Sequence, residues 1–232
     1  MKAIIVAGGH GSRLYPLTNF THKTLLPLCG RPIIDYVLST IRRAGIVDIT
    51  IIGNKFIDKI REHVGPEVNY VLEETPQGVA SALQLARKGN EGCPLLIWFS
   101  DNITNIDLKS EIESFNKGAI LLTREVENPS EFGIAVLDEG IVVDVVEKPK
   151  NPPSNLAIGG IYIFDEKFWE RLDSVQNLPS FSISDVTRQY LVEGDSTVIS
   201  VGENTWIDCG TPENLQRAAQ MVHDGLFTIR EG

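Results

Sequence analysis

Two aspartates stand where an apolar run gives way to a polar turn, a position from which a carboxylate can reach a ligand. Asp101 follows the run Leu95–Phe99, and Asp208 follows Trp206-Ile207. Ligands of open α/β sheets bind beyond the carboxyl ends of the strands. Mg²⁺ takes one or two carboxylates together with phosphate oxygens and water. The two aspartates are therefore candidate magnesium ligands, although each taken alone also suits a turn or a helix cap.

A glycine-rich turn follows the first apolar run, Lys2–Ala7. It contains the candidate anion-binding residues Gly8, Gly9, Gly11, Ser12 and Arg13. Glycines let the backbone turn tightly and expose N–H groups to an anion, and arginine adds a planar fork of donors. The turn lacks the Gly-Lys-Ser/Thr of a Walker loop, and Tyr15-Pro16 breaks the helix that a dinucleotide fingerprint requires. It is either a nucleotide site of another kind or a tight turn only.

Lys23 stands in the next predicted loop, just before an apolar run. From there it could reach the same phosphates, or it could be a solvated surface lysine. Residues 1–43 hold six basic residues and one acidic residue in a chain whose net charge is −10. A basic N-terminal segment in an acidic protein suggests a local anion-binding site. His10 and His22 have no cluster of partners, so we expect no metal role for them.

Composition limits the class of protein. The chain has 232 residues, 42% of them hydrophobic, which suffices for one well-buried domain over residues 1–232. The pI of 4.9 disfavours nucleic acid as a partner. Three cysteines without a CxxC pair favour a reducing, cytoplasmic compartment. The first apolar run is too short for a signal sequence or a membrane span, so no membrane partner is expected.

The first half, residues 1–125, alternates predicted strands and helices. The strands are Lys2–Ala7, Asp48–Ile52, Asn69–Leu72, Leu95–Phe99 and Ala119–Thr123. The helices are Pro32–Ala44 with Pro32 at the first helical position, Ile57–Val64, Val79–Lys88 and Leu108–Asn116. Apolar strands separated by helices predict an α/β fold with a mostly parallel sheet covered on both faces.

The second half, residues 126–232, predicts a different pattern. Asp138-Glu139-Gly140 is a hairpin signal between the strands Gly133–Leu137 and Ile141–Glu147. Further strands are predicted at Ala157–Phe164, Thr197–Val201 and Thr205–Ile207, and helices at Lys167–Asp173, Ser184–Glu193 and Thr211–Gly225 with Thr211 as N-cap. We expect an antiparallel insertion over the carboxyl edge of the sheet.

Taken in order, Gly-Gly-x-Gly-Ser-Arg-Leu, Lys23 and the following Leu-Pro resemble the sugar-phosphate nucleotidyltransferases, and most closely the glucose-1-phosphate thymidylyltransferases. The resemblance extends from residue 2 to about residue 222. It implies a Rossmann-like fold and Mg²⁺-dependent transfer from an NTP, dTTP or UTP favoured, to a sugar 1-phosphate, glucose 1-phosphate favoured. The glycine loop and Arg13 would hold the NTP phosphates, Lys23 would stabilise the departing pyrophosphate, and Asp101 and Asp208 would share the metal.

The resemblance also assigns the acceptor side. Glu147 would accept sugar hydroxyls, Lys148 would contact the acceptor phosphate, Gly133 would leave room for the pyranose, and Asn102 and Asn155 match substrate-contacting positions. Pro149 biases Lys148 toward extended backbone, so that neighbouring side chains alternate across the strand. Without the resemblance, Glu147 and Lys148 are an exposed ion pair. Trp206 is either a core aromatic residue or a sugar platform.

Two features depart from the resemblance. Glu73 stands where a thymidylyl enzyme has glutamine, in a base-reading segment that includes Gln77 and Gly78. A carboxylate only accepts hydrogen bonds, which raises CTP or GTP as alternatives and predicts that Glu73→Gln increases dTTP or UTP use relative to CTP. The chain also stops before the helices of the family's long form, so we expect a product-feedback site to be absent or altered. A homo-oligomer and a non-catalytic nucleotide-binding module remain open.

Overall fold

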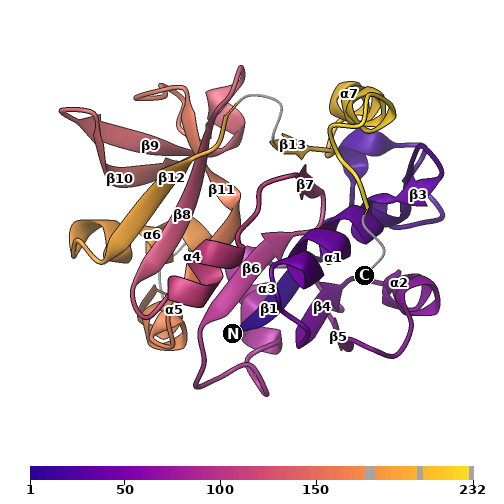
Figure 1. Ribbon diagram of the computed structural model, residues 1–232, viewed down its shortest axis with the longest axis horizontal. Helices are drawn as coiled ribbons and strands as arrows, with labels where there is room; N and C mark the ends of the chain where they lie inside the picture. Colours follow the sequence, from indigo (N-terminus) through magenta and orange to yellow (C-terminus); the bar gives the residue numbers. More distant parts are fainter. Residues whose placement is uncertain (176–180, 203–205, 230–232) are drawn as a thin grey trace.

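The apolar runs of the first half form a parallel sheet. The computed structural model describes residues 1–175, 181–202 and 206–229. The strands are β1 (Lys2–Ala7), β4 (Ile49–Gly53), β5 (Asn69–Leu72) and β6 (Leu95–Phe99). They lie side by side in the order β6-β1-β4-β5, all parallel (Figure 1). The central strands are almost wholly buried because helices cover both faces, which explains their unbroken apolar sequence.

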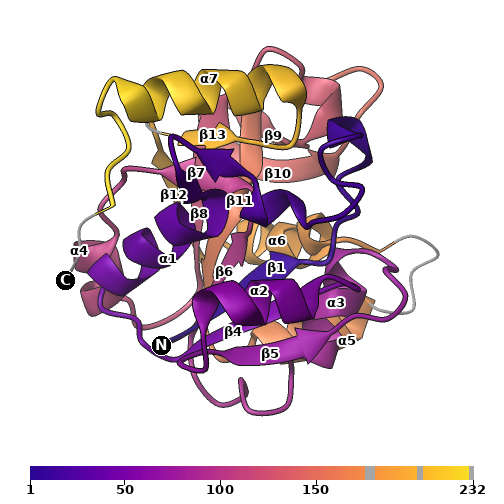
Figure 2. The same ribbon diagram turned by 90° about the vertical axis from the view of Figure 1, so that its right-hand side faces the viewer.

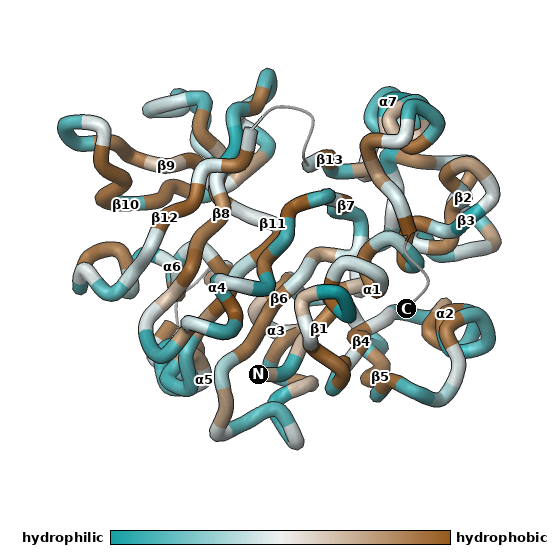
Figure 3. The backbone as a smooth tube through the Cα atoms, viewed as in Figure 1, coloured by the Kyte–Doolittle hydropathy of each residue, from teal (hydrophilic) through white to brown (hydrophobic). Residues whose placement is uncertain are grey.

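Two hydrophobic cores occupy the two faces of this sheet. One contains side chains of β1 and β4 together with those of α1 (Ile33–Arg43) and α2 (Ile57–Val64), and it extends to α7 (Pro212–His223). The other packs against α3 (Val79–Leu85), α5 (Phe168–Val175) and α6 (Ile183–Val192). The short α4 (Lys109–Ser114) lies at the first core. In Figure 3 the hydrophobic colour follows the strands, whereas the connecting loops are hydrophilic.

The second half continues the same sheet. Its strands are β8 (Ala119–Glu125), β9 (Gly133–Asp138), β10 (Ile141–Glu147), β11 (Leu156–Phe164) and β12 (Ser196–Ser200). β11 runs antiparallel to β6, β8 and β9, and β12 is parallel to β8. Across the described residues one nine-stranded sheet results. The antiparallel insertion is thus hydrogen-bonded into the parallel sheet through β11, and the expected fold class is confirmed.

Two small ribbons lie outside the main sheet. β2 (Pro27–Leu28) pairs with β3 (Arg31–Pro32), and β7 (Asn102–Thr104) pairs antiparallel with β13 (Trp206–Asp208). Figure 2 shows α7 along the top of the molecule with β13 beneath it. The β7–β13 ribbon joins the middle of the chain to its end.

Most predicted elements are present with shifted ends. β1, β5, β6, β10 and α2 begin and end at the predicted residues. Pro32 is the N-cap of α1 rather than its first helical residue, because pairing with Pro27 keeps it extended at ψ 151°. Arg13 and Lys23 lie in single-turn 3-10 helices instead of open loops. Thr205, predicted to begin a strand, lies outside the described residues.

The β9–β10 turn confirms the hairpin signal. Glu139 and Gly140 both have positive φ, at 47° and 83°. A two-residue hairpin turn requires this conformation to match the twist of its strands.

Among the described residues, no helix has the length and apolarity needed to cross a lipid bilayer.

Candidate active site

The side chains of Asp101 and Asp208 converge, although the residues are far apart in the chain. Asp208 pairs with Asn102 in the β7–β13 ribbon, and the Cys209 N–H donates to the Asp101 carbonyl at 2.8 Å. A Cβ placed on Gly210 would lie 2.7 Å from Asp208 Oδ1 and 3.5 Å from Asp101 Oδ2. The same point is 3.1 Å from Nη2 of Arg13. Gly210 leaves open the space at which these three side chains meet.

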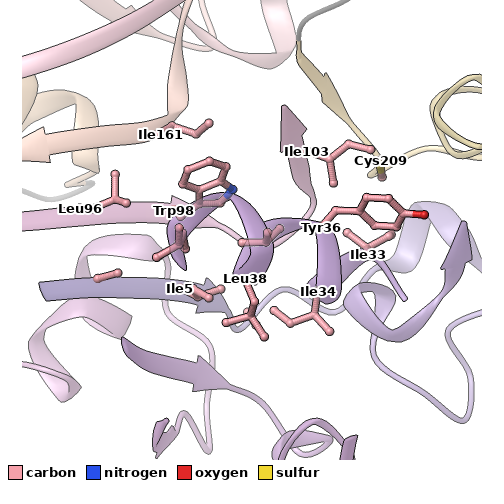
Figure 4. Close-up of a cluster of buried hydrophobic side chains, with 14 of the residues drawn as sticks. Ile5, Ile33, Ile34, Tyr36, Leu38, Leu96, Trp98, Ile103, Ile161 and Cys209 are labelled. Carbon is pink, nitrogen blue, oxygen red and sulfur yellow. The ribbon is translucent and has the colours of Figure 1, made fainter. Parts of the chain in front are cut away.

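The ribbon that carries the aspartates is anchored in the core. Ile103 of β7 and Cys209, next to Asp208, are buried with Tyr36 of α1 (Figure 4). The indole of Trp98 donates to the Asn102 carbonyl at 2.8 Å. Burial of apolar neighbours on either side fixes where each carboxylate projects, because packed interiors tolerate little displacement.

Lys23 supplies the counter-charge of the pair. Its Nζ donates to Oδ2 of the buried Asp101. Burial acts to raise the pKa of Asp101, but the charge and hydrogen bond of Lys23 outweigh it and leave this pKa below its usual value. Burial and the Asp101 charge raise the pKa of Asp208 to about 6. One lysine therefore faces two carboxylates, and the pair retains a negative charge near neutral pH.

This donor set fits a small hard cation. It consists of two carboxylates, and in the described part of the chain no group of three or more His, Cys, Asp or Glu side chains is placed to hold a metal ion. Mg²⁺ needs only one or two carboxylates when phosphate oxygens and water complete its shell. The neighbouring Cys209 is buried and its thiol pKa is raised well above the ordinary value by burial, so a soft thiolate ligand is not at hand. The carboxylates suit Mg²⁺ better than a thiophilic metal.

Asn102 lies inside the site, and each polar atom of its side chain has a partner within the protein. Its Nδ2 donates to Asp101 Oδ1 at 2.8 Å, and its Oδ1 accepts from the Trp206 indole N–H at 2.7 Å. A Cβ on Gly160 would lie 2.8 Å from the Trp206 ring, so the indole packs directly on that glycine, whose φ is 82°. Asn102 therefore braces Asp101, and its predicted substrate contact stays a prediction. Trp206 is buried in the core and also lines the cavity described below.

The glycine loop lies beside Lys23. A Cβ on Gly9 would lie 3.5 Å from Lys23 Nζ. Gly11 adopts the left-handed conformation at φ 64°, and Thr18 Oγ1 donates to its carbonyl at 2.8 Å. The Asn54 amide donates to the carbonyls of Gly8 and Gly9 at 3.2 and 3.1 Å. With its carbonyls bound on the protein side, the loop can turn N–H groups toward an anion.

Arg13 connects the loop to the other half of the molecule. Its Nη1 lies 2.7 Å from Glu131 Oε2, in an ion pair whose side chains are about half exposed. Glu131 ends the single-turn helix Pro129–Glu131, which leads into β9. A guanidinium held this way remains accessible to phosphate oxygens, since exposed ion pairs exchange partners at little cost.

One of the predicted base-reading residues, Glu73, lies next to the glycine loop. Glu73 is buried, and its carboxylate is so close to Gly8 that a Cβ there would collide with it. Burial raises the pKa of Glu73, opposed by a backbone hydrogen bond from Gln77. Gly78 is the N-cap of α3 at φ 107°. Glu73 therefore borders the loop on the β4–β5 side.

The predicted acceptor residues form a second cluster. Gly133 pairs with Glu147 across the hairpin, and Ser184 Oγ of α6 donates to Glu147 Oε2 at 2.6 Å. Lys148 is not extended as predicted: its N–H closes the ladder on the Phe132 carbonyl, and its φ of 42° turns the chain out of the strand. Lys148 Nζ is 3.8 Å from Glu147 Oε1. In the described residues neither side chain bonds to Asp101, Asp208, Lys23 or Arg13.

Asn155 lines a cavity of about 980 Å³ with Arg124, Phe132 and Trp206.

The sequence did not predict a role for Arg124. Its guanidinium stacks between the rings of Phe132 and Trp206, 5.4 and 5.2 Å from their centroids, and its charge acts on Asp208. Ser184 and Gly210 were also missed. Only Gly210 carried a signal, since it stands between Asp208 and the N-cap Thr211, which accepts from the Asn214 N–H.

His22 is buried, and its Nδ1 accepts from the Thr24 N–H at 3.2 Å. Burial and the Lys23 charge lower its pKa to about 4, so the imidazole is neutral at pH 7. This environment suits a packed structural histidine, since a lowered pKa removes its charge across the physiological range.

Comparison with known proteins matches nearly the whole chain. The nucleotidyl transferase family model matches residues 2–225. A low-salt glycan biosynthesis nucleotidyltransferase, Agl11, of Haloferax volcanii is 34% identical over 247 residues, covering 100% of this chain and 69% of the relative. A glucose-1-phosphate thymidylyltransferase of Xanthomonas campestris is 33% identical over 246 residues, covering 100% and 83%.

Solved structures agree with the fold. A Bacillus anthracis protein described as a glucose-1-phosphate thymidylyltransferase, in complex with a sucrose, superposes with a TM-score of 0.89 at 32% identity, covering 100% of this chain and 97% of that one. A UDP-glucose pyrophosphorylase complexed with UDP-glucose superposes with a TM-score of 0.83 at 21% identity, covering 97% and 98%. At that identity the second structure supports the fold alone.

Proposed function

The chain belongs to the nucleotidyl transferase family and is a nucleotidyltransferase, and from this premise we propose that it joins an NTP to a sugar 1-phosphate, releasing pyrophosphate. The observation that carries the proposal is the convergence of Asp101, Asp208 and Arg13 on the open space at Gly210, with Lys23 bonded to Asp101. The names of the relatives favour dTTP as the nucleotide and glucose 1-phosphate as the acceptor, and UTP is kept beside dTTP from the sequence resemblance. Glu73 keeps CTP and GTP as alternatives.

Each charged residue has one task in the proposed reaction. Arg13 and the N–H groups of the glycine loop bind the NTP phosphates, and Lys23 offsets the charge that develops on the departing pyrophosphate. Lys148 holds the acceptor phosphate, and Glu147 accepts sugar hydroxyls. Asp101 and Asp208 would hold Mg²⁺, which when bound neutralises phosphate charge.

The chemical step needs no covalent enzyme intermediate. One oxygen of the sugar phosphate attacks the α-phosphorus in line, and the bond to the β-phosphate oxygen breaks with its electron pair leaving on pyrophosphate. Positioning and electrostatic stabilisation account for catalysis in phosphoryl transfer of this kind. The buried Cys209 thiol, with its raised pKa, is unsuited to act as a nucleophile. Three free cysteines are consistent with the proposed cytoplasmic location.

Pyrophosphate release measured with ATP, CTP, GTP, UTP and dTTP against a panel of sugar 1-phosphates tests the proposal. We expect turnover with at least one pair, its loss in Asp101→Asn and Asp208→Asn, and its retention in Asp58→Asn, whose carboxylate makes only an exposed pair with Arg61. Folded protein that binds nucleotide but releases no pyrophosphate with any pair would instead be a regulatory nucleotide-binding module.

A further inference from the structure

Resting on the proposed function, we propose that the carboxylate of Glu73 selects a nucleobase with two adjacent N–H donors, which makes GTP the preferred nucleotide rather than dTTP or UTP. This departs from what the names of the relatives favour. It follows from the place of Glu73 in the sheet, from the absence of a lysine or arginine paired with it among the described residues, and from the hydrogen-bonding pattern of the bases.

The sheet order places the nucleoside beside Glu73. Asp101 follows β6, the glycine loop follows β1, and Glu73 follows β5, in the order β6-β1-β4-β5. The predicted acceptor residues Gly133 and Glu147 lie beyond β6 on the opposite side, in β9 and β10. An NTP whose phosphates lie on the loop, with its α-phosphate toward Asp101, therefore has the β4–β5 side left for its base.

Glu73 lies on that side, with its side chain buried against the glycine loop. Its N–H donates to the Gly53 carbonyl of β4 at 2.8 Å, so the residue is held at the end of the paired strands. Its carboxylate lies directly on Gly8, the first residue of the glycine loop. Any side chain at Gly8 would displace it. A base whose phosphates bind the loop therefore lies within reach of this carboxylate.

The buried Asn54 side chain on this side is already satisfied. The Asn54 amide donates to the Gly8 and Gly9 carbonyls, and its oxygen accepts from the Phe56 N–H at 3.0 Å. Two groups act on the Glu73 carboxylate, the Gln77 backbone N–H, which donates to it, and the nearby charge of His10. No lysine or arginine of the described residues is paired with it. An ionised carboxylate has about four acceptor sites, and burying it without donors is costly. A ligand that brings N–H groups would remove this cost.

The four base types differ in what they offer a carboxylate. Thymine and uracil present one ring N–H between two carbonyls, so the second carboxylate oxygen would face a carbonyl and repel it. Cytosine and adenine present an amino group beside an unprotonated ring nitrogen. Guanine alone presents a ring N–H next to an amino group, which matches both oxygens of one carboxylate in a charge-assisted pair. Such a pair discriminates by roughly 5- to 150-fold.

The competing interpretation is a protonated Glu73. A neutral carboxylic acid has one donor and resembles glutamine in shape, so it could read thymine or uracil. If Glu73 stays protonated up to pH 8, dTTP or UTP would be used best at both pH 6 and pH 8, and GTP would hold no advantage. The two interpretations therefore predict opposite orders of nucleotide preference at pH 8.

The test is kcat/KM for GTP, ITP, CTP, UTP and dTTP at pH 6 and pH 8 with the best sugar 1-phosphate. ITP keeps the ring N–H of GTP but lacks its amino group. We expect GTP to be used best, with ITP at least about 5-fold worse. Glu73→Gln should reduce GTP use and raise dTTP or UTP use, whereas the matched control Glu74→Gln, at an exposed position, should change neither.

Binding separates this inference from the reaction itself. Thermal shift with GTP, ITP and dTTP is measured on wild type, Glu73→Gln and Glu74→Gln, and needs no acceptor sugar. If no pyrophosphate forms but GTP still stabilises the wild type more than ITP or dTTP, the proposed function is wrong and the base preference stands. If dTTP or UTP exceeds GTP in wild-type turnover and binding, or ITP equals GTP, the role given to Glu73 is wrong.

Discussion

The indole N–H of Trp206 donates to the side-chain oxygen of Asn102 at 2.7 Å. The Asn102 amide in turn donates to Asp101 at 2.8 Å. One asparagine thus connects a buried aromatic residue of β13 to a carboxylate that follows β6. Because each amide atom has a single partner of fixed polarity, this arrangement also sets the orientation of the amide group. It makes the position of Asp101 depend on correct docking of β13.

Asn102→Ala should lower both stability and turnover. The change leaves the Trp206 N–H without a partner and removes a donor from the Asp101 carboxylate, and a buried unpaired polar group costs about 1–3 kcal/mol. Urea unfolding and pyrophosphate release measure the two effects. Trp206→Phe should give a smaller loss of turnover, since the Asn102–Asp101 bond persists. Equal kcat in Asn102→Ala and wild type would show that Asp101 needs no brace.

Gly210→Ala should reduce turnover while the fold survives. The added Cβ would lie 2.7 Å from Asp208 Oδ1 and 3.1 Å from an Arg13 nitrogen, so the carboxylate must move. A displacement of about 1 Å can cost roughly 100-fold in rate. The control is Gly202→Ala, whose Cβ would meet no atom of the described residues within 4 Å. Similar kcat values for the two variants would mean that the space at Gly210 is not used.

Lys23→Met should destabilise the protein strongly. It leaves the buried Asp101 without its cation, and breaking a buried pair from one side costs about 3–5 kcal/mol. The double variant Lys23→Met/Asp101→Asn should recover much of this loss without recovering activity. Chemical denaturation of the three proteins measures the effect, with Lys109→Met, from an exposed pair with Glu113, as control. A single variant as stable as wild type would contradict the buried ion pair.

Asp208→Asn should abolish turnover yet stabilise the metal-free protein at neutral pH. The pKa of Asp208 is raised from 3.8 to about 6, so the folded state binds this proton more tightly than the unfolded state. The free energy of unfolding of the wild type should therefore fall as pH rises from about 4 to 6, by up to about 3 kcal/mol. The asparagine variant lacks this contribution.

The comparison is thermal unfolding of wild type and Asp208→Asn in EDTA at several pH values. The two melting curves should coincide near pH 4 and separate above pH 6, with the variant higher. If the wild type is the more stable protein at pH 7 without metal, the charge repulsion between Asp101 and Asp208 has been overestimated. Asp224→Asn, at an exposed position after α7, is the matched control and should follow the wild type.

Local signals predicted the regular elements well. β1 and β6 begin and end where the sequence placed them, because strands buried on both faces read as unbroken apolar runs bounded by polar turns. β7 was missed because three residues are too few to show a period, and its partner β13 is equally short. Helix ends shifted by a few residues, as at α3, which ends at Leu85.

The sequence by itself determined which chemical groups the site contains: a glycine turn, Arg13, Lys23 and two aspartates that follow apolar runs. Such features depend on residue type and near neighbours, so they are readable along the chain. Only the tertiary structure decided that Asn102 pairs with Asp208, that Asn102 is a brace, and that Glu73 lies against Gly8. These relations arise from strand register and from packing between segments that are far apart in the chain. The free energy of bringing such segments together cannot be read from the residues near each position.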